Sequence, residues 1–158
     1  MKKRKSWREK LKDSKGLPKL TEVTGKMSKR WGTGKMVIPA PMEVDQLMKQ
    51  VPKGQVVTIN ELRAALAAQH KADFACPLTT GIFSWMAAHA AAEAEAHGVK
   101  CITPYWRTLK NGGEINAKYP GGAEGLAKRL HAEGHKIIRK GKRILVAEYQ
   151  NALFAGLA

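Results

Sequence analysis

An alanine-rich stretch at residues 79–97 predicts one long helix, which ends at Gly98. One face of this helix carries larger side chains at helical spacing: Ile82, Trp85, Met86 and His89. Histidine and glutamate interrupt the apolar run, which falls short of the roughly 18 residues that a membrane-spanning helix needs. We therefore expect no membrane partner. With 44% apolar residues in 158, the chain can bury the core of one ordinary domain.

Three further helices are predicted around this one. The first is marked by apolar residues at the spacing i, i+3, i+4 and i+7: Val44, Leu47, Met48 and Val51. A turn at residues 52–54 and a short extended piece follow it. Thr58 and Glu61 then form a capping box, which predicts a helix over residues 59–68. The last helix spans about residues 122–133 and ends at Gly134.

A basic β-hairpin is predicted near the C-terminus. Ile137-Ile138 and Ile144-Leu-Val146 flank the turn residues Lys140-Gly-Lys142. Helices joined by a tight turn and followed by such a hairpin, a candidate wing, are typical of DNA-binding domains. We predict a fold that is mainly α with short strands, a winged helix-turn-helix-like DNA-binding domain over residues 42–150.

The positive charge is concentrated in the first quarter of the chain. Residues 1–40 contain thirteen Lys and Arg and three acidic residues, against a net charge of +15 for the whole chain. Glycines and prolines interrupt this segment, so we expect residues 1–41 to form a basic, flexible N-terminal arm. Two interpretations stay open: a polyanion contact, or a solvated tail that aids solubility. Trp7 and Trp31 would either dock on the domain or stack on bases.

The two cysteines, Cys76 and Cys101, form no CxxC pair, which argues against a zinc finger of the usual spacing. They fit a reducing compartment, and the basic N-terminus lacks the apolar segment of a secretory signal. We expect a cytoplasmic protein, nucleoid-associated if bacterial. His131 and His135 are separated by the helix end at Gly134, so no metal site is predicted, and no cofactor is expected.

Three motifs occur in the order in which one known family carries them. They are Val51-Pro-Lys-Gly-Gln-Val-Val-Thr58, Ile102-Thr-Pro-Tyr-Trp-Arg107, and Tyr119-Pro-Gly-Gly122 with Leu130-His-Ala-Glu-Gly134. They resemble the turn and strand, the Pro-Cys-His-Arg segment, and the Tyr-Ser-Gly-Gly loop with its following helix end in the DNA-binding domain of alkylguanine-DNA alkyltransferases. The resemblance covers roughly residues 43–137 and implies that domain's fold.

The resemblance also shows what is missing. The family's nucleophilic cysteine is activated through a histidine and a glutamate, and those places hold Tyr105, Trp106 and Glu133. A phenol is a poor substitute for a thiolate, and an indole cannot act as a base. Cys101 lies four positions before Tyr105, too far along the chain for the geometry of attack. We therefore predict no alkyl transfer and no catalytic residue. In this the chain resembles the alkyltransferase-like proteins, which bind alkylated guanine without repairing it.

Other positions depart from both branches of the family. Ile59 stands where the family places a tyrosine after the strand, and Leu78 stands where an arginine enters the base stack. The helix that follows is longer here by about ten residues. Leu78 would either wedge between bases, as apolar side chains do in other proteins, or pack at the helix entry against Phe74 or Ile82.

Candidate DNA contacts follow from this alignment. Residues 72–99 contain no Lys or Arg, so the recognition helix would approach DNA through small side chains and N-terminal amides. The residues expected at the bases or the base pocket are Tyr105, Trp106, Arg107, Tyr119, Leu78, Thr79, Thr80 and Ser84. Phosphate contacts are assigned to Lys53, Lys100, Lys110 and Lys118.

Two functions are carried forward. The first is a non-enzymatic, monomeric protein that binds double-stranded DNA, recognises alkylated guanine and recruits a repair-protein partner. In it, Tyr105 and Trp106 would line a pocket for a flipped base; the opposing interpretation is that both belong to the core. The alternative is a general DNA- or chromosome-binding protein without lesion specificity. A third function is an enzyme that uses Cys101 as its nucleophile. It would require attack from a residue four positions before Tyr105, the family's cysteine position.

Overall fold

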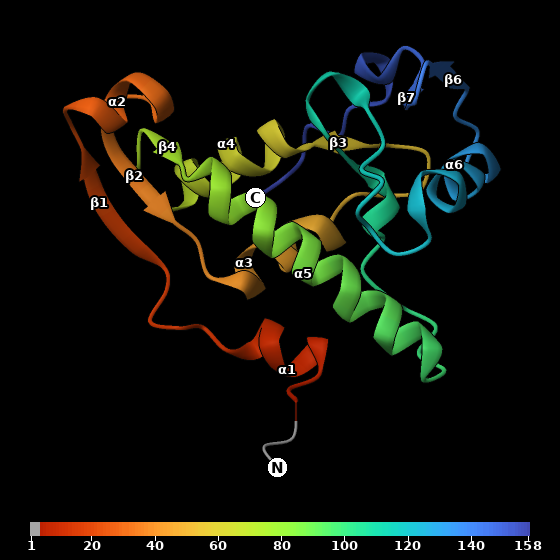
Figure 1. The fold of residues 1–158 in the computed structure, drawn as a ribbon, viewed down its shortest axis with the longest axis horizontal. Helices are drawn as coiled ribbons and strands as arrows, with labels where there is room; N and C mark the ends of the chain where they lie inside the picture. Colours follow the sequence, from red (N-terminus) through yellow and green to blue (C-terminus); the bar gives the residue numbers. More distant parts are fainter. Residues whose placement is uncertain (1–3) are drawn as a thin grey trace.

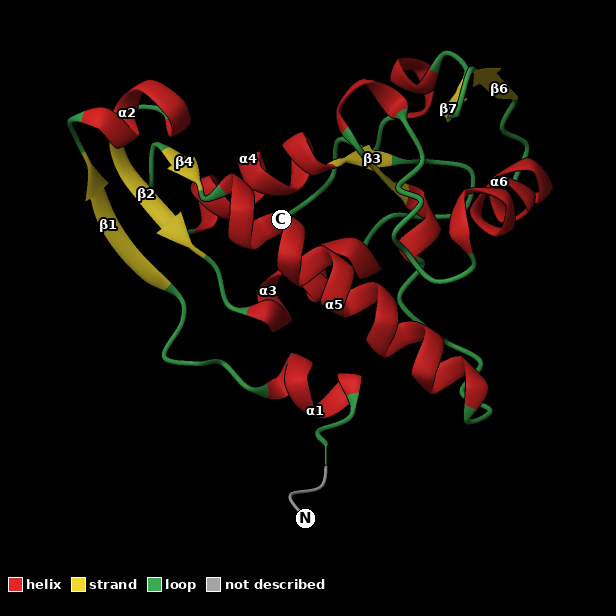
Figure 2. Ribbon diagram, viewed as in Figure 1, coloured by secondary structure: helices red, strands yellow, loops and turns green. Residues whose placement is uncertain are grey.

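The computed structural model describes residues 4–158. Within this range the helices are α1 (Trp7–Lys12), α2 (Lys26–Trp31), α3 (Pro41–Lys49), α4 (Ile59–Gln69), α5 (Pro77–Ala96) and α6 (Gly122–Ala132). The strands are β1 (Lys19–Val23), β2 (Gly34–Ile38), β3 (Val57–Thr58), β4 (Phe74–Ala75), β5 (Thr108–Leu109), β6 (Ile137–Lys140) and β7 (Arg143–Val146). The 3-10 turns are η1 (Tyr105–Arg107), η2 (Asn111–Gly113) and η3 (Tyr149–Ala152). The prediction of a mainly helical fold with short strands is confirmed (Figure 2).

Helix α5 crosses the middle of the molecule and packs against α1, α3, α4 and η1 (Figure 1). Its alanines let neighbouring backbones approach closely, and Ala87 and Ala88 are fully buried. Buried leucines and valines of α3, α4 and α6 complete one continuous core around it. Within the described range, no helix is long and apolar enough to cross a membrane.

The predicted helices form where their end signals place them. Thr58 caps α4 by accepting a hydrogen bond from the Asn60 N–H at 3.2 Å, and Glu61 accepts one from the Thr58 N–H at 3.0 Å. Helix α3 begins at Pro41, whose missing N–H is harmless at a first helical position. The basic hairpin is also confirmed, with Ile137 opposite Val146 in the antiparallel pair β6–β7.

The N-terminal segment differs from the flexible arm expected from its charge and glycines. Strand β1 pairs with β2 antiparallel, and β2 pairs with β4 in parallel, which joins Met36 to Phe74 and Val37 to Ala75. Helix α1 lies against α5 (Figure 1). The physical reason is burial: Val37 is inaccessible to solvent, and Val23, Met36 and Cys76 form a small second core. These few apolar positions lie among many lysines, so the segment has no clear hydrophobic periodicity from which its strands could be predicted.

Two further pairings involve the segment that follows α3: one with β5 and one with the C-terminal segment. Strands β3 and β5 run parallel, with Val57 opposite Thr108. The C-terminal segment extends past the predicted boundary at residue 150. There the Val56 N–H donates to the Ala152 carbonyl at 2.9 Å, and the Phe154 N–H donates to the Val56 carbonyl at 2.9 Å. These bonds hold the turn after α3 against the end of the chain.

Candidate nucleic-acid interface

The turn η1 is held in place by a buried ion pair. Arg107 donates from Nε and Nη2 to the two carboxylate oxygens of Glu133, at 2.8 and 2.7 Å. Its Nη1 donates to the Val51 carbonyl at 2.8 Å. The side chains of Arg107 and Glu133 are 14% and 8% exposed. Arg107 therefore fastens η1 to the end of α6 and to the turn after α3, rather than facing outward.

Glu133 also fixes the neighbouring indole. Trp106 Nε1 donates to Glu133 Oε2 at 3.0 Å, and the guanidinium of Arg129 lies 4.4 Å from the Trp106 ring centre. Burial disfavours the charge of Glu133, but hydrogen bonds from Arg107 and Trp106 outweigh it, so the pKa of Glu133 lies below its ordinary value. The carboxylate is thus an acceptor for three N–H donors and is not available as a base.

The phenols of Tyr105 and Tyr119 lie in the interior. Each side chain is 3% exposed, and the two ring centres are 6.3 Å apart. Burial raises the pKa of Tyr105, and it raises the pKa of Tyr119 to about 12. Tyr119 Oη donates to Ser84 Oγ at 3.0 Å, which ties the loop before α6 to α5. Both phenols therefore stay neutral at physiological pH.

The structure divides the expected base-contact residues into two groups. Thr80 and Ser84 are buried on the inner face of α5 with the two tyrosines, and Thr80 Oγ1 donates to the Cys76 carbonyl at 2.6 Å. Thr79 Oγ1 is buried as well and makes no hydrogen bond within the described part of the chain. Leu78, by contrast, is 59% exposed. These side chains therefore do not converge on one open pocket.

The open space lies on the outer face of α5. A groove of about 760 Å³ is lined by Pro77, Leu78, Gly81, Ile82, Trp85, His89, Asn116 and Lys118. All but the last two residues come from α5, and Asn116 and Lys118 come from the loop before α6. Ile82, like Leu78, is exposed. The helical spacing places Ile82 and Trp85 on one face of α5 but does not indicate that this face is a surface.

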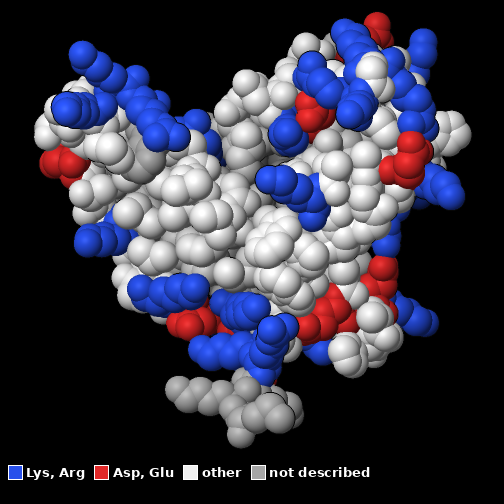
Figure 3. Space-filling view, in the orientation of Figure 1, with Lys and Arg blue, Asp and Glu red and all other residues white. Residues whose placement is uncertain are grey.

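One basic side chain, Lys118, lines this groove, and further cations lie elsewhere on the surface. Figure 3 shows a largely uncharged region across the middle of one face, with many Lys and Arg and fewer Asp and Glu around it. Of the predicted phosphate contacts, Lys53, Lys100 and Lys118 are exposed and have no ion pair among the described residues. Lys110 is exposed but lies 3.1 Å from Glu114. The hairpin adds Lys140 and Lys142, both exposed.

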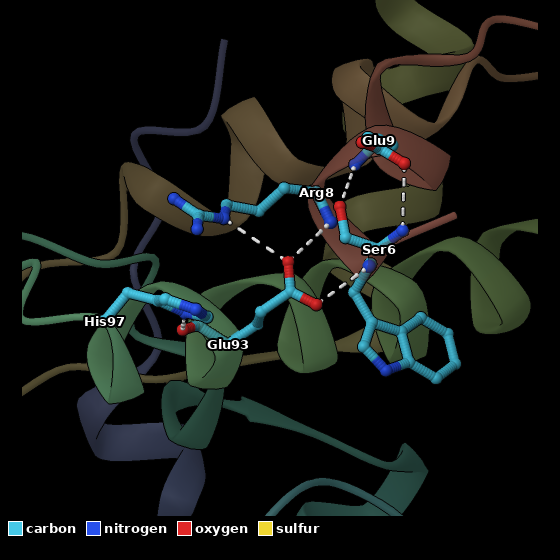
Figure 4. Close-up of polar contacts among 6 residues, drawn as sticks. Ser6, Arg8, Glu9, Glu93 and His97 are labelled. Carbon is cyan, nitrogen blue, oxygen red and sulfur yellow. Dashed lines mark hydrogen bonds and ion pairs between the residues drawn. The ribbon is translucent and has the colours of Figure 1, made fainter. Parts of the chain in front are cut away.

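Helix α1 packs against two residues that line the groove, Trp85 and His89, so Trp7 docks on the domain. The Trp7 ring stacks on His89 at 4.5 Å and meets Trp85 edge-on at 4.9 Å. Glu93 of α5 accepts from the backbone N–H groups of Trp7 and Arg8, at 3.0 and 3.3 Å, and from Arg8 Nε at 3.3 Å (Figure 4). A carboxylate at a helix N-terminus satisfies amides that have no partner within the helix.

The cysteines lie outside this region. Cys76 is buried beneath the N-terminal strands, and Cys101 is exposed beside a cavity of about 180 Å³ that Leu11 and Met42 also line. Among the described residues, no group of three His, Cys, Asp or Glu is placed to hold a metal ion.

No protein-family model matches the sequence, and no curated protein matches it. Two solved structures match the fold, both of S. pombe proteins. One is Atl1 in complex with damaged DNA containing O6-carboxymethylguanine, with a TM-score of 0.51, 17% identity, and coverage of 72% of this chain and 93% of that chain. The other is ATL in complex with DNA, with a TM-score of 0.52 and the same identity and coverage. The resemblance drawn from the three motifs is confirmed at the level of the fold.

Proposed function

We propose that the chain is a DNA-binding protein of the alkyltransferase-like type, which holds duplex DNA against α5 and transfers no alkyl group. The observation that carries this proposal is the fold, which the chain shares with two solved structures from S. pombe, each of a complex with DNA. A shared fold does not by itself assign a function, so the proposal also depends on the surface of α5.

The outer face of α5 suits the groove of a duplex. It presents Leu78, Gly81 and Ile82 around an open groove and carries no Lys or Arg, so the helix can approach base edges closely. Lys118, which lines the groove, and other exposed cations such as Lys53 would contact the phosphates and fix the register of the complex. In this arrangement the hairpin β6–β7 acts as the wing of a winged helix. Leu78 would lie against the bases, where apolar wedges enter other duplexes.

The absence of transfer follows from chemistry. An alkyl acceptor must be a soft nucleophile in its ionised form, and Tyr105 is a neutral phenol whose pKa is raised further by burial. Trp106 donates its only N–H to Glu133 and cannot take up a proton. Cys101 lies beside α1 and not at the turn η1.

A second function, general DNA binding without lesion specificity, is favoured by one observation. Tyr105 and Tyr119 are both buried, so a flipped base would have to displace packed side chains before it could enter. Lesion recognition therefore requires a rearrangement that general binding does not. The two functions differ in whether an alkylated guanine changes affinity, and they share the prediction that α5 contacts the duplex.

Anisotropy titrations with two otherwise identical duplexes, one of which contains a single O6-alkylguanine, test both functions. Tighter binding of the alkylated duplex supports alkyltransferase-like recognition, and equal affinity supports general binding. Failure to bind either duplex at low salt overturns the proposal. Intact-mass measurement after incubation with the alkylated duplex checks the chemistry, since a gain of one alkyl group contradicts the predicted lack of transfer.

A further inference from the structure

The segment from β1 through β2, residues 19–38, forms a small basic unit that we call the N-terminal lobe. It carries one acidic residue, Glu22, and five exposed basic residues: Lys19, Lys26, Lys29, Arg30 and Lys35. Within the described chain, none of these five cations makes an ion pair. Three of them lie on the single short helix α2. The lobe therefore presents a concentrated, uncompensated positive charge.

This lobe is joined rigidly to the start of α5. Strand β2 pairs with β4, which ends two residues before α5 begins. The Lys35 N–H donates to Asp73 Oδ2 and the Asp73 N–H donates to the Lys35 carbonyl, each at 2.8 Å. The Cys76 N–H donates to the Val37 carbonyl at 2.9 Å. Because α5 begins at the next residue, Pro77, these bonds fix the position of the lobe relative to the exposed N-terminal end of α5.

The lobe also has its own apolar interior. Val23, Met36 and Cys76 are buried together, with Ile38 and Phe74 packed against them. An arm that only supplied charge would not need such a core. The core instead holds β1, β2 and the connecting α2 as one body, so the cations of α2 are presented from a folded platform.

The positions of the charges suggest one partner. In Figure 3 basic side chains gather over α2 on one side of the face and over the β6–β7 hairpin on the other, and the N-terminal half of α5, which has no charged residue, begins between these two sides. A duplex that spans the distance from α2 to the hairpin, across the N-terminal half of α5, would bring one stretch of its backbone toward each of them. Lys and Arg that meet phosphates release condensed counterions, which favours binding.

We propose that the N-terminal lobe is a second phosphate-binding surface, which holds the DNA duplex beyond the Leu78 end of α5. This inference rests on the proposed function. It assigns to the lobe a share of the sequence-independent binding energy, in addition to the phosphate contacts of the other cations, while α5 contacts the groove of the DNA. It also predicts a contact with DNA that extends on both sides of α5.

The test neutralises the three cations of α2. The variant Lys26→Gln/Lys29→Gln/Arg30→Gln is compared with Lys26→Arg/Lys29→Arg/Arg30→Lys, which keeps the charge. Each phosphate contact contributes about 0.9 to the slope of log affinity against log salt, so the glutamine variant should lose about 2 to 3 from the magnitude of that slope. The charge-preserving variant should keep the wild-type slope. Circular dichroism melting verifies that both variants are folded.

Hydroxyl-radical footprinting of a longer duplex locates the lost contact. The glutamine variant should lose protection at one end of the footprint, and Lys140→Gln/Lys142→Gln, in the hairpin, should lose it at the other end. An unchanged slope and footprint in the α2 variant, with wild-type binding intact, overturns this inference alone. Protection lost at the same end by both variants also overturns it. If the wild-type chain binds no duplex, the proposed function fails instead.

Discussion

Arg107 and Glu133 meet through two parallel hydrogen bonds in a nearly buried position, and this pair joins the turn η1 to the end of α6. The indole of Trp106 shares the same carboxylate. In this chain, the segment that resembles an alkyl-transfer site is therefore a structural junction. Its polar groups are satisfied by one another, and the first two predictions test that role.

Replacing Arg107 with methionine should lower the free energy of unfolding by about 3 kcal/mol, because the Glu133 carboxylate then remains buried without its counter-charge. Denaturant unfolding at neutral pH measures the change. Lysine at position 107 keeps the charge but not the two-point geometry, so Arg107→Lys should fall between wild type and Arg107→Met. A loss below about 1 kcal/mol in the methionine variant would contradict a structural role for the pair.

The Arg107–Glu133 pair also predicts that the stability of the protein depends on pH. The folded-state pKa of Glu133 lies below its ordinary value of 4.5, since its hydrogen bonds to Arg107 and Trp106 outweigh the effect of burial. Its contribution to stability is therefore fully present above about pH 4.5 and is lost as the pH falls through the folded-state pKa. The difference in the free energy of unfolding between wild type and Arg107→Met should be largest near neutral pH and should become smaller below pH 4.5. Melting curves at several pH values measure it, and a constant difference would exclude this linkage.

Replacing Trp7 with alanine should release α1 from α5. Trp7 contacts both Trp85 and His89, and such aromatic pairs contribute about 0.5–1.5 kcal/mol beyond their buried area. We expect a stability loss of about 2 kcal/mol and faster hydrogen exchange at the backbone amides that Glu93 accepts from. Trp7→Phe keeps an aromatic ring and should lose less stability than Trp7→Ala. Unchanged exchange in the alanine variant would show that Glu93 alone holds α1.

Leu78→Glu tests the outer face of α5 as a DNA surface. Because Leu78 is 59% exposed, the substitution should change stability by no more than about 0.5 kcal/mol. A carboxylate against the duplex should weaken binding at least about tenfold, since like-charge contacts cost several kcal/mol. Leu78→Ala serves as the matched control without the charge. Equal affinity of all three proteins in anisotropy titrations would remove α5 from the interface.

The helices were predictable because their signals are local. The capping box of Thr58 and Glu61 and the glycine after α6 lie next to the ends they mark, and the structure has helix ends there. The parallel pairs β2–β4 and β3–β5 join segments that are distant in sequence, and each strand of the second pair has two residues. Such short, non-local pairs leave no periodic pattern.

The site was predictable only in part for a related reason. The motif Ile102–Arg107 located the segment, but burial decides what its side chains do, and burial depends on the whole fold. Tyr105 faces the core, while Leu78 faces solvent from the same region of the molecule. The docking of Trp7 depends on Glu93, a residue on another element whose charge alone indicates no partner.

The contact between Glu93 and the first turn of α1 also constrains the order in which the chain can mature. Helix α1 has six residues, too few to persist by itself, and its capping carboxylate lies 85 residues after Arg8. During synthesis the N-terminus therefore emerges long before its partner exists. Closing so long a loop costs entropy that only the completed α5 can offset. The first helix in the sequence should accordingly be among the last to gain protection from hydrogen exchange during folding.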